Sequence, residues 1–320
     1  MSTAPTISIC IPTYGRARHI SATLESIVSQ TRSDFEIVVV DDDSPDGTQE
    51  VVQQFRDSRI RFFRNTKNKG VPANYSHALS LARGRFLSLV EDHDILEPEY
   101  IESTVSILET HHNVGFAATG IQTIDDAAGK PLRVYVADFD KVTNGRSMLR
   151  RLLTRTDCPF SLTTMMRREV LDHVFPWFDE RYWWYADIHL WMRLLAIADF
   201  GYVSRPLLRF REREVGHVLD SSYWETAMCL DRIHRDDWHL LHSRHSLAAL
   251  RDALQYEIAK IKSVAGMKGG KIARGEDWTT SDAEQAARYL SFPSRAFVSS
   301  MNLVPRSVYR GVRAMQQGVD

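Results

Sequence analysis

Two hydrophobicity patterns alternate along the first ninety residues of the chain. Short apolar runs, typical of strands that are buried on both faces, are separated by segments in which apolar residues recur at helical spacing. The strand-like runs lie at residues 6–12, 35–40, 59–64 and 85–90, and the helix-like segments at residues 16–31, 49–55 and 71–82. This alternation predicts βαβ units, and therefore an α/β fold with a mainly parallel sheet flanked by helices.

The pattern becomes less regular in the middle of the chain and changes again near residue 220. Two strands around a turn are indicated first, and further strand and helix signals follow, at residues 114–136, 145–156, 162–174 and 184–198. The remainder indicates long helices with few strand signals. We therefore expect an α/β domain over residues 1–217 and a helical C-terminal region over residues 218–320, associated with an acceptor or a membrane.

The composition excludes several classes of protein. The formal net charge is −1, so the chain has no general basic field for nucleic acid. Three scattered cysteines, Cys10, Cys158 and Cys229, argue against a disulfide framework and against a zinc–thiolate site. The sequence begins without a signal-peptide pattern, and no apolar stretch reaches the roughly 18 residues of a membrane span. We expect a cytoplasmic protein.

Polar segments directly follow three of the strand-like runs. They are PTYGR at residues 12–16, DDDSPDGT at residues 41–48 and EDHD at residues 91–94. In parallel α/β sheets, ligands bind beyond the carboxyl ends of the strands. We therefore expect these three segments to converge at one edge of the molecule.

The EDHD segment ends a buried strand with three carboxylates and an imidazole. Such groups repel one another and are costly to bury unless a cation compensates them, and Glu, Asp and His are all ligands of divalent cations. The alternative is a solvated loop before a helix that begins near Pro98. That alternative suits Asp94, because acids favour helix N-termini, but it does not explain Glu91, Asp92 and His93.

Two more carboxylates are candidates for binding or catalysis. Asp42 follows the second strand and can accept an N–H group of a nucleobase, although its surroundings also read as an ordinary turn. Asp187 begins the helix-like segment at residues 184–198, next to aromatic residues that can stack on a sugar ring. It is a candidate general base, and the alternative is an N-capping residue.

Taken together, these motifs resemble the family-2 glycosyltransferases with the GT-A fold. The matching segments are ISICIPTYGR, FEIVVVDDDSPDGT, NKGVPANYSHALSLARGRFLSLVEDHDILEPEY and FDERYWWYADIHLWMRL, in this order within residues 5–215. The resemblance implies a Rossmann-like sheet and an inverting enzyme that moves a sugar from a nucleotide diphospho-sugar to an acceptor hydroxyl. It does not extend beyond residue 220.

The resemblance also implies roles for particular residues. The loop formed by Pro12, Thr13 and Tyr14 would hold the nucleotide, with Tyr14 against the base and Arg16 nearby. Asp42 would bond the base.

The family's Asp-x-Asp-Asp motif falls on Glu91, Asp92, His93 and Asp94. His93 is then the first candidate for a metal ligand and Glu91 is the second. Asp92 would contact the nucleotide-sugar. Asp187 matches the family's catalytic base. The sequence departs from the family pattern at His93, where an Asp is usual, and at Ala186, where a Glu is usual.

We expect a divalent metal, Mn²⁺ in preference to Mg²⁺, and a glycan or lipid-linked acceptor. The transferred group would be a hexose or deoxyhexose, in the synthesis of surface polysaccharide or glycolipid. A basic amphipathic segment at residues 294–314 suggests peripheral contact with the inner face of the membrane. The alternatives are an inactive nucleotide-sugar-binding or scaffold protein and a nucleotidyltransferase. A dinucleotide oxidoreductase is excluded because GxGxxG does not follow the first strand.

Overall fold

The computed structural model describes residues 5–125, 129–154, 161–212, 231–233, 236–237, 239–240, 247–273 and 279–289. The chain divides into two compact units, one of residues 1–149 and 158–217 and the other of residues 150–157 and 218–320. The basic segment at residues 294–314, Cys158 and Cys229 lie outside the described residues.

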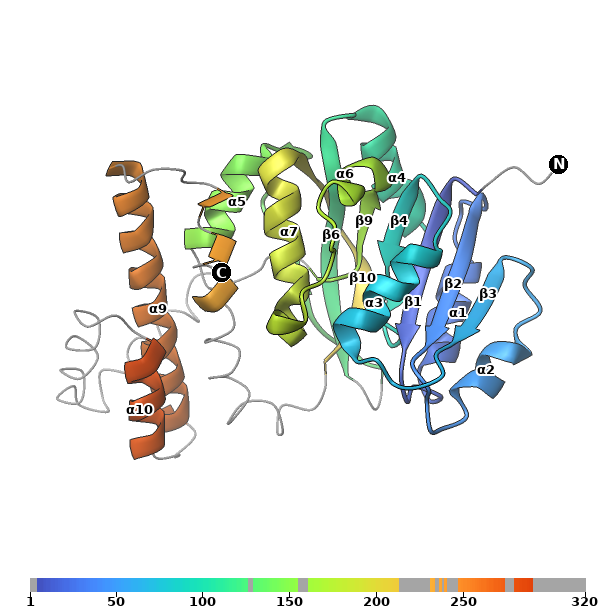
Figure 1. Cartoon of the computed structure of the whole chain (residues 1–320), viewed down its shortest axis with the longest axis horizontal. Helices are drawn as coiled ribbons and strands as arrows, with labels where there is room; N and C mark the ends of the chain where they lie inside the picture. The colour runs from blue at the N-terminus through green and yellow to red at the C-terminus, as the bar shows by residue number, and fades with distance from the viewer. Residues whose placement is uncertain are drawn as a thin grey trace. The chain divides into compact units, whose positions relative to one another are not determined.

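The first part of the larger unit is a run of alternating strands and helices, as the hydrophobicity pattern predicts (Figure 1). Its elements are β1 (Ile7–Thr13), α1 (Ile20–Val28), β2 (Phe35–Asp41), α2 (Thr48–Gln54), β3 (Ile60–Arg64), α3 (Val71–Leu81) and β4 (Phe86–Leu89). The strands are parallel in the order β3-β2-β1-β4. The predicted βαβ units are confirmed.

The sheet continues beyond β4 in the order β9-β6-β10-β5. The remaining elements among the described residues are β5 (Ile95–Leu96), α4 (Tyr100–Thr110), β6 (Val114–Asp125), β7 (Pro131–Tyr135), β8 (Val142–Thr143), α5 (Gly145–Thr154), β9 (Thr164–Arg167), α6 (Arg168–Asp172), the 3₁₀ helix η1 (Glu180–Tyr185), α7 (Ala186–Ile197), β10 (Asp199–Glu212), α9 (Leu247–Ala273) and α10 (Thr280–Tyr289). Because β9 runs antiparallel to both β4 and β6, the complete sheet is mixed.

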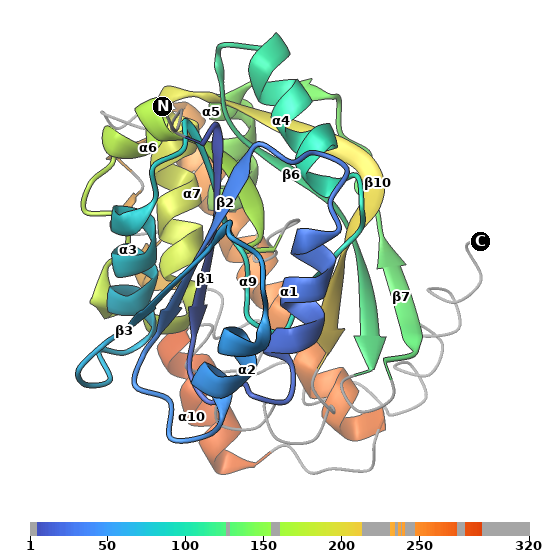
Figure 2. The same ribbon diagram turned by 90° about the vertical axis from the view of Figure 1, so that its right-hand side faces the viewer.

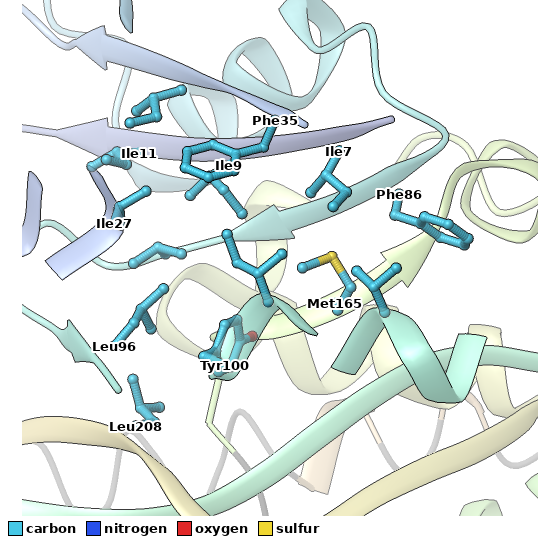
Figure 3. Close-up of a cluster of buried hydrophobic side chains, with 14 of the residues drawn as sticks. Ile7, Ile9, Ile11, Ile27, Phe35, Phe86, Leu96, Tyr100, Met165 and Leu208 are labelled. Carbon is cyan, nitrogen blue, oxygen red and sulfur yellow. The ribbon is translucent and has the colours of Figure 1, made fainter. Parts of the chain in front are cut away.

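Helices cover both faces of the parallel strands. In Figure 2, α3 and α7 lie on one side of β1 and β2, and α1 lies on the other. Every residue of β1 and β2 is buried, which explains their nearly continuous apolar sequences. Figure 3 shows Ile7, Ile9 and Ile11 of β1 within the cluster that includes Tyr100 of α4. This core fixes the strand ends from which the polar loops emerge.

A buried arginine holds the C-terminal end of α4. Arg167 is only 3% exposed and donates hydrogen bonds to the carbonyl oxygens of Leu108, His111 and Val114. No ion pair of Arg167 is found among the described residues. Helix-end carbonyls carry partial negative charge, so they take the place of a carboxylate partner. Burial nevertheless lowers the pKa of Arg167.

Two ion pairs stabilise the smaller unit. Arg150 binds Asp252 of α9 through two nitrogens, and Lys260 of α9 binds Asp231 at 3.0 Å. The acceptor carboxylates and Lys260 are buried, so the pairing compensates their desolvation. Among the described helices of the chain, none is both long and apolar enough to cross a membrane.

Candidate active site

The three polar segments predicted to converge do so at the carboxyl edge of the parallel strands. Thr13 at the end of β1 is paired with Asp41 at the end of β2. On the other side of β1, the amide of Val90 donates to the carbonyl of Cys10 at 2.9 Å. The loops that follow β1, β2 and β4 therefore start side by side.

The loop after β1 is held by side chains from the other two segments. Four successive backbone N–H groups donate to side-chain oxygens: Tyr14 to Asp92 (3.3 Å), Gly15 to Ser44 (2.9 Å), Arg16 to Thr48 (3.0 Å) and Ala17 to Asp46 (3.1 Å). Gly15 has φ +65°, a conformation that glycine adopts without strain. A phosphate-binding loop needs free backbone N–H groups. In this loop those groups are already engaged.

The predicted nucleotide-binding residues divide into two kinds. Pro12 and Thr13 are buried at the end of β1, where the Thr13 carbonyl accepts from the amide of Asp42. Tyr14 is 49% exposed, and its ring is accessible to a ligand. The Arg16 side chain is partly exposed, and its Nε donates to Asp92 at 3.1 Å. Tyr14 and Arg16 thus present side chains at the edge, whereas Pro12 and Thr13 shape the backbone beneath.

Asp42 has an internal role that the sequence did not reveal. Its carboxylate is only 2% exposed and accepts from the Asn65 side chain and from the amides of Lys69 and Gly70. These contacts hold the loop between β3 and α3 against the end of β2. The direct contact of Asp42 with a base stays a prediction.

Three residues of the EDHD segment form a cluster that can hold a metal ion. One ligand atom each from Glu91, His93 and Asp94 lies within 4.8 Å of the others. Two ligands on opposite sides of one small divalent cation are about 4.2 Å apart, so only slight closure is needed. Carboxylates suit both Mn²⁺ and Mg²⁺, and an imidazole among the ligands moves the preference toward Mn²⁺. The residues therefore fit the expected metal.

Asp94 is the member of this cluster that sequence reasoning missed. It was not among the expected metal ligands, and the alternative of a solvated loop would have left it near a helix N-terminus, but α4 begins at Tyr100 and Asp94 is fully buried. Its Oδ2 accepts from Thr163 at 3.0 Å, while its Oδ1 has no hydrogen-bond partner among the described residues. Burial and the charge of Glu91 raise its pKa well above the ordinary value. A cation would supply the partner that Oδ1 lacks.

His93 lies between two carboxylates. Its Nδ1 is 3.1 Å from Oδ1 of Asp92, and its Nε2 is 3.8 Å from Oε2 of Glu91. Burial, the largest influence, lowers the pKa of His93. The hydrogen bond to Asp92 and the negative charges nearby outweigh burial, so the net shift of the pKa is upward.

Asp187 lies at the start of α7 and is not one of the residues that form the metal cluster. The helix begins at Ala186 and follows directly on η1, and Asp187 accepts from the amide of Ile188 at 2.8 Å. Tyr185, not Asp187, is the N-cap. Burial, and then the charge of Glu91, raise the pKa of Asp187 to about 7. A carboxylate in this condition is suited to accept a proton near neutral pH.

Tyr75 of α3 is a second site residue that the sequence did not identify. Its hydroxyl lies 3.5 Å from Oε1 of Glu91, and its ring packs edge-on against Phe178. Burial and the charge of Glu91, followed by those of the other site acids, raise its pKa well above the ordinary value. Tyr75 therefore remains a protonated donor. A tyrosine in mid-helix carries no sequence signal for such a role.

Comparison with known proteins identifies the family of the chain. The sequence model of Glycosyl transferase family 2 matches residues 8–175. EpsE of Bacillus subtilis (strain 168), provisionally named a glycosyltransferase, is 27% identical over 224 residues, which cover 66% of this chain and 75% of EpsE. The Escherichia coli protein WfgD, named UDP-Glc:alpha-D-GlcNAc-diphosphoundecaprenol beta-1,3-glucosyltransferase, is 33% identical over 120 residues, or 38% of this chain and 47% of WfgD.

Two solved structures share the fold. Residues 1–349 of Staphylococcus aureus TarS, in complex with UDP, match with a TM-score of 0.63 at 16% identity, over 98% of this chain and 92% of that one. The mannosyltransferase PcManGT from Pyrobaculum calidifontis, in complex with GDP-Man and Mn²⁺, matches with a TM-score of 0.53 at 16% identity, over 99% and 85%. The family match spans more than half of the chain, and the predicted resemblance is confirmed: this chain belongs to glycosyl transferase family 2.

Proposed function

We propose that the protein is a metal-dependent inverting glycosyltransferase that uses a nucleotide diphospho-sugar. The observation that carries the proposal is the contrast between two neighbouring sets of carboxylates. One set, Glu91 and Asp94 with His93, fits a cation. The other is the single carboxylate of Asp187, whose pKa is raised to about 7 and which is free of that cluster. Separate sites for a metal and a base are what this reaction requires.

Asp187 acts as the general base. Its carboxylate takes the proton of the acceptor hydroxyl while the hydroxyl oxygen forms a bond to the anomeric carbon. The bond between that carbon and the diphosphate oxygen breaks on the opposite face of the sugar, so the configuration inverts. A base works best when its pKa lies near the operating pH, and burial of Asp187 provides this.

Glu91, His93 and Asp94 would hold the metal. When bound, a divalent cation stabilises the negative charge of the departing diphosphate. The backbone of the loop after β1 offers little alternative compensation, because four of its N–H groups are engaged by side chains. Arg16 and the exposed Arg18 are cations of that loop. This arrangement also argues against a nucleotidyltransferase with a phosphate-binding loop.

The substrates are proposed by analogy with the relatives. WfgD is named for UDP-Glc and for a diphosphoundecaprenol-linked acceptor, TarS was solved with UDP and PcManGT with GDP-Man and Mn²⁺. We infer a hexose or deoxyhexose donor and a lipid-linked acceptor, in the assembly of surface polysaccharide or glycolipid. Residues 1–217 would carry the catalytic domain. Residues 218–320, including the basic segment at 294–314, would serve the acceptor at the cytoplasmic face of the membrane.

A transfer assay tests the proposal. The full chain is incubated with Mn²⁺, with labelled UDP- and GDP-sugars in turn, and with polyprenyl-diphosphate-linked N-acetylglucosamine. We expect a product whose anomeric configuration, measured by NMR, is opposite to that of the donor, and whose formation stops in excess EDTA. Retained configuration would contradict inversion. Binding of a nucleotide-sugar without turnover on any acceptor would favour the inactive binding protein.

A further inference from the structure

Asp92 lies between the candidate metal cluster and the loop after β1, and it contacts residues of both. Its side chain is largely buried, and it is absent from the group of atoms that can share an ion. Its Oδ1 accepts from Nε of Arg16 at 3.1 Å and lies 3.1 Å from Nδ1 of His93. Its Oδ2 accepts from the amide of Tyr14 at 3.3 Å. One carboxylate thus touches both functional segments.

The contact with His93 decides which ring nitrogen can bind a metal. A carboxylate can only accept, so the proton of the neutral imidazole resides on Nδ1, which faces Asp92. Nε2 then carries the lone pair, and Nε2 is the nitrogen that faces Glu91. A carboxylate that orients a metal-binding histidine in this way commonly raises metal affinity.

The contacts with Tyr14 and Arg16 fix the other segment. Tyr14 is the exposed aromatic residue proposed to face the base, and Arg16 is a cation of the same loop. Because both are joined to the carboxylate that holds His93, the position of the loop depends on the position of the imidazole. Two sites that share one element with two arrangements are thermodynamically coupled.

We propose that Asp92 is a positioning residue that couples metal binding to nucleotide binding. It holds the tautomer of His93 that ligates the metal, and it transmits the ordering of His93 to the loop that receives the nucleoside. This inference rests on the proposed metal and nucleotide sites. It accounts for the departure from the family pattern, since an imidazole at position 93 is supplied with its own orienting carboxylate at position 92.

The first test measures Mn²⁺ binding without nucleotide, by electron paramagnetic resonance of the free ion. Asp92→Asn should lower Mn²⁺ affinity by about 10-fold or more. Asp46→Asn is the matched control, because Asp46 also holds the loop, through the amide of Ala17, but does not contact His93. It should leave Mn²⁺ affinity unchanged. In a His93→Ala background, Asp92→Asn should lose its effect on Mn²⁺ affinity.

The second test measures whether Mn²⁺ binding strengthens nucleoside binding when no diphosphate links the two. Uridine and guanosine have no phosphate, so the diphosphate cannot bridge the nucleoside to the bound ion. Equilibrium dialysis of the labelled nucleosides should show tighter binding to the wild type with Mn²⁺, by about 5-fold or more. Asp92→Asn should abolish this gain, and Asp46→Asn should retain it. If Asp92→Asn does not fold, Arg16→Met breaks the same link from the loop side and should reduce the gain while retaining Mn²⁺ binding.

The outcomes separate this inference from the proposed function. Wild-type protein that binds neither Mn²⁺ nor any nucleotide overturns both. Wild-type protein that binds Mn²⁺ and a nucleotide-sugar, with Asp92→Asn and Asp46→Asn behaving alike in both tests, overturns the coupling role alone. Loss of Mn²⁺ affinity and of the nucleoside gain in Asp92→Asn only, with unchanged circular dichroism, establishes it.

Discussion

Replacement of Asp187 by Asn should damage the enzyme and stabilise the protein at the same time. The proposed base would be lost, so turnover should fall by about 10²–10⁴-fold. Yet the carboxylate that is removed is one whose charge is unfavourable in the folded chain, since burial and Glu91 raise its pKa to about 7. Asn has a similar shape and carries no charge. The two effects therefore have one cause and opposite signs.

The size of the stabilisation follows from the pKa. The pKa rises from 3.8 to about 7 on folding, and each unit corresponds to about 1.4 kcal/mol. Because the carboxyl pKa is higher in the folded state than in the unfolded state, the folded state binds the proton more tightly. The resulting stability is fully present below the unfolded-state pKa of about 4 and is lost as the pH rises through 7. The limit is about 4 kcal/mol at pH 8, and because the side chain is only half-buried by surface area we expect about 1–3 kcal/mol. At pH 5 most of this cost is absent.

Urea unfolding at pH 5 and pH 8, in EDTA, measures the effect. Relative to the wild type, Asp187→Asn should gain stability at pH 8 and much less at pH 5. Asp179→Asn is the control, because Asp179 is hydrogen-bonded to Arg181 and its pKa is lowered. That contribution is present above pH 4, so Asp179→Asn should destabilise the protein equally at both values.

The pH dependence of activity tests the carboxylate of Asp187 independently. In the wild type kcat/KM should rise with pH up to about 7, and at pH 6 only about a tenth of Asp187 is ionised. A bound metal near Glu91 would offset the charge of Glu91 and move the rise in kcat/KM to lower pH. The part of the pKa shift of Asp187 that burial causes would remain. A flat profile from pH 5 to 8, together with equal stability of Asp187→Asn and wild type at pH 8, would refute the assignment of a buried base.

Changes at four residues test other parts of the site and fold. If His93 is a ligand, turnover should be higher with Mn²⁺ than with Mg²⁺. His93→Asp should narrow this difference in turnover, and His93→Ala should nearly abolish metal-dependent turnover. Full activity of His93→Ala would show that His93 is not a metal ligand. Asp42→Ala should weaken nucleotide binding by about 1–3 kcal/mol in calorimetry, and unchanged affinity would limit Asp42 to holding the loop before α3. Tyr75→Phe should lower Mn²⁺ affinity several-fold without altering the unfolding midpoint, because only the hydroxyl facing Glu91 is removed. Arg167→Met should lower the free energy of unfolding by about 3 kcal/mol, since buried carbonyls at the end of α4 lose their donor; an unchanged urea midpoint would show that those carbonyls find other partners.

The parallel half of the fold was predictable from local patterns, and the rest of the sheet was not. Nearly continuous apolar runs such as residues 35–40 identify strands that are covered on both faces, and strand–helix alternation fixes their direction. These two rules also predicted the convergence of the loops after β1, β2 and β4. The antiparallel course of β9 depends on contacts with β4 and β6, which are far away in sequence. A four-residue strand contains no information about those partners.

The EDHD segment shows why the metal cluster could be predicted only in part. In an extended chain, alternate side chains point to opposite sides, so Glu91 and His93 would share one side and Asp92 would lie on the other. The carboxylate of Asp92 does reach Arg16, but its Oδ1 also lies 3.1 Å from Nδ1 of His93. The same alternation would place Asp94 with Asp92. Instead, the amide of Asp94 donates to the carbonyl of Glu91 at 3.1 Å, which closes a turn. The turn makes the first and fourth residues neighbours, so Asp94 joins the metal cluster while Asp92 is left to orient His93. The four residues thus divide three to one because the chain turns at them, after β4 has ended at Leu89, and the roles of Asp92 and Asp94 follow from the backbone between them rather than from their identical side chains.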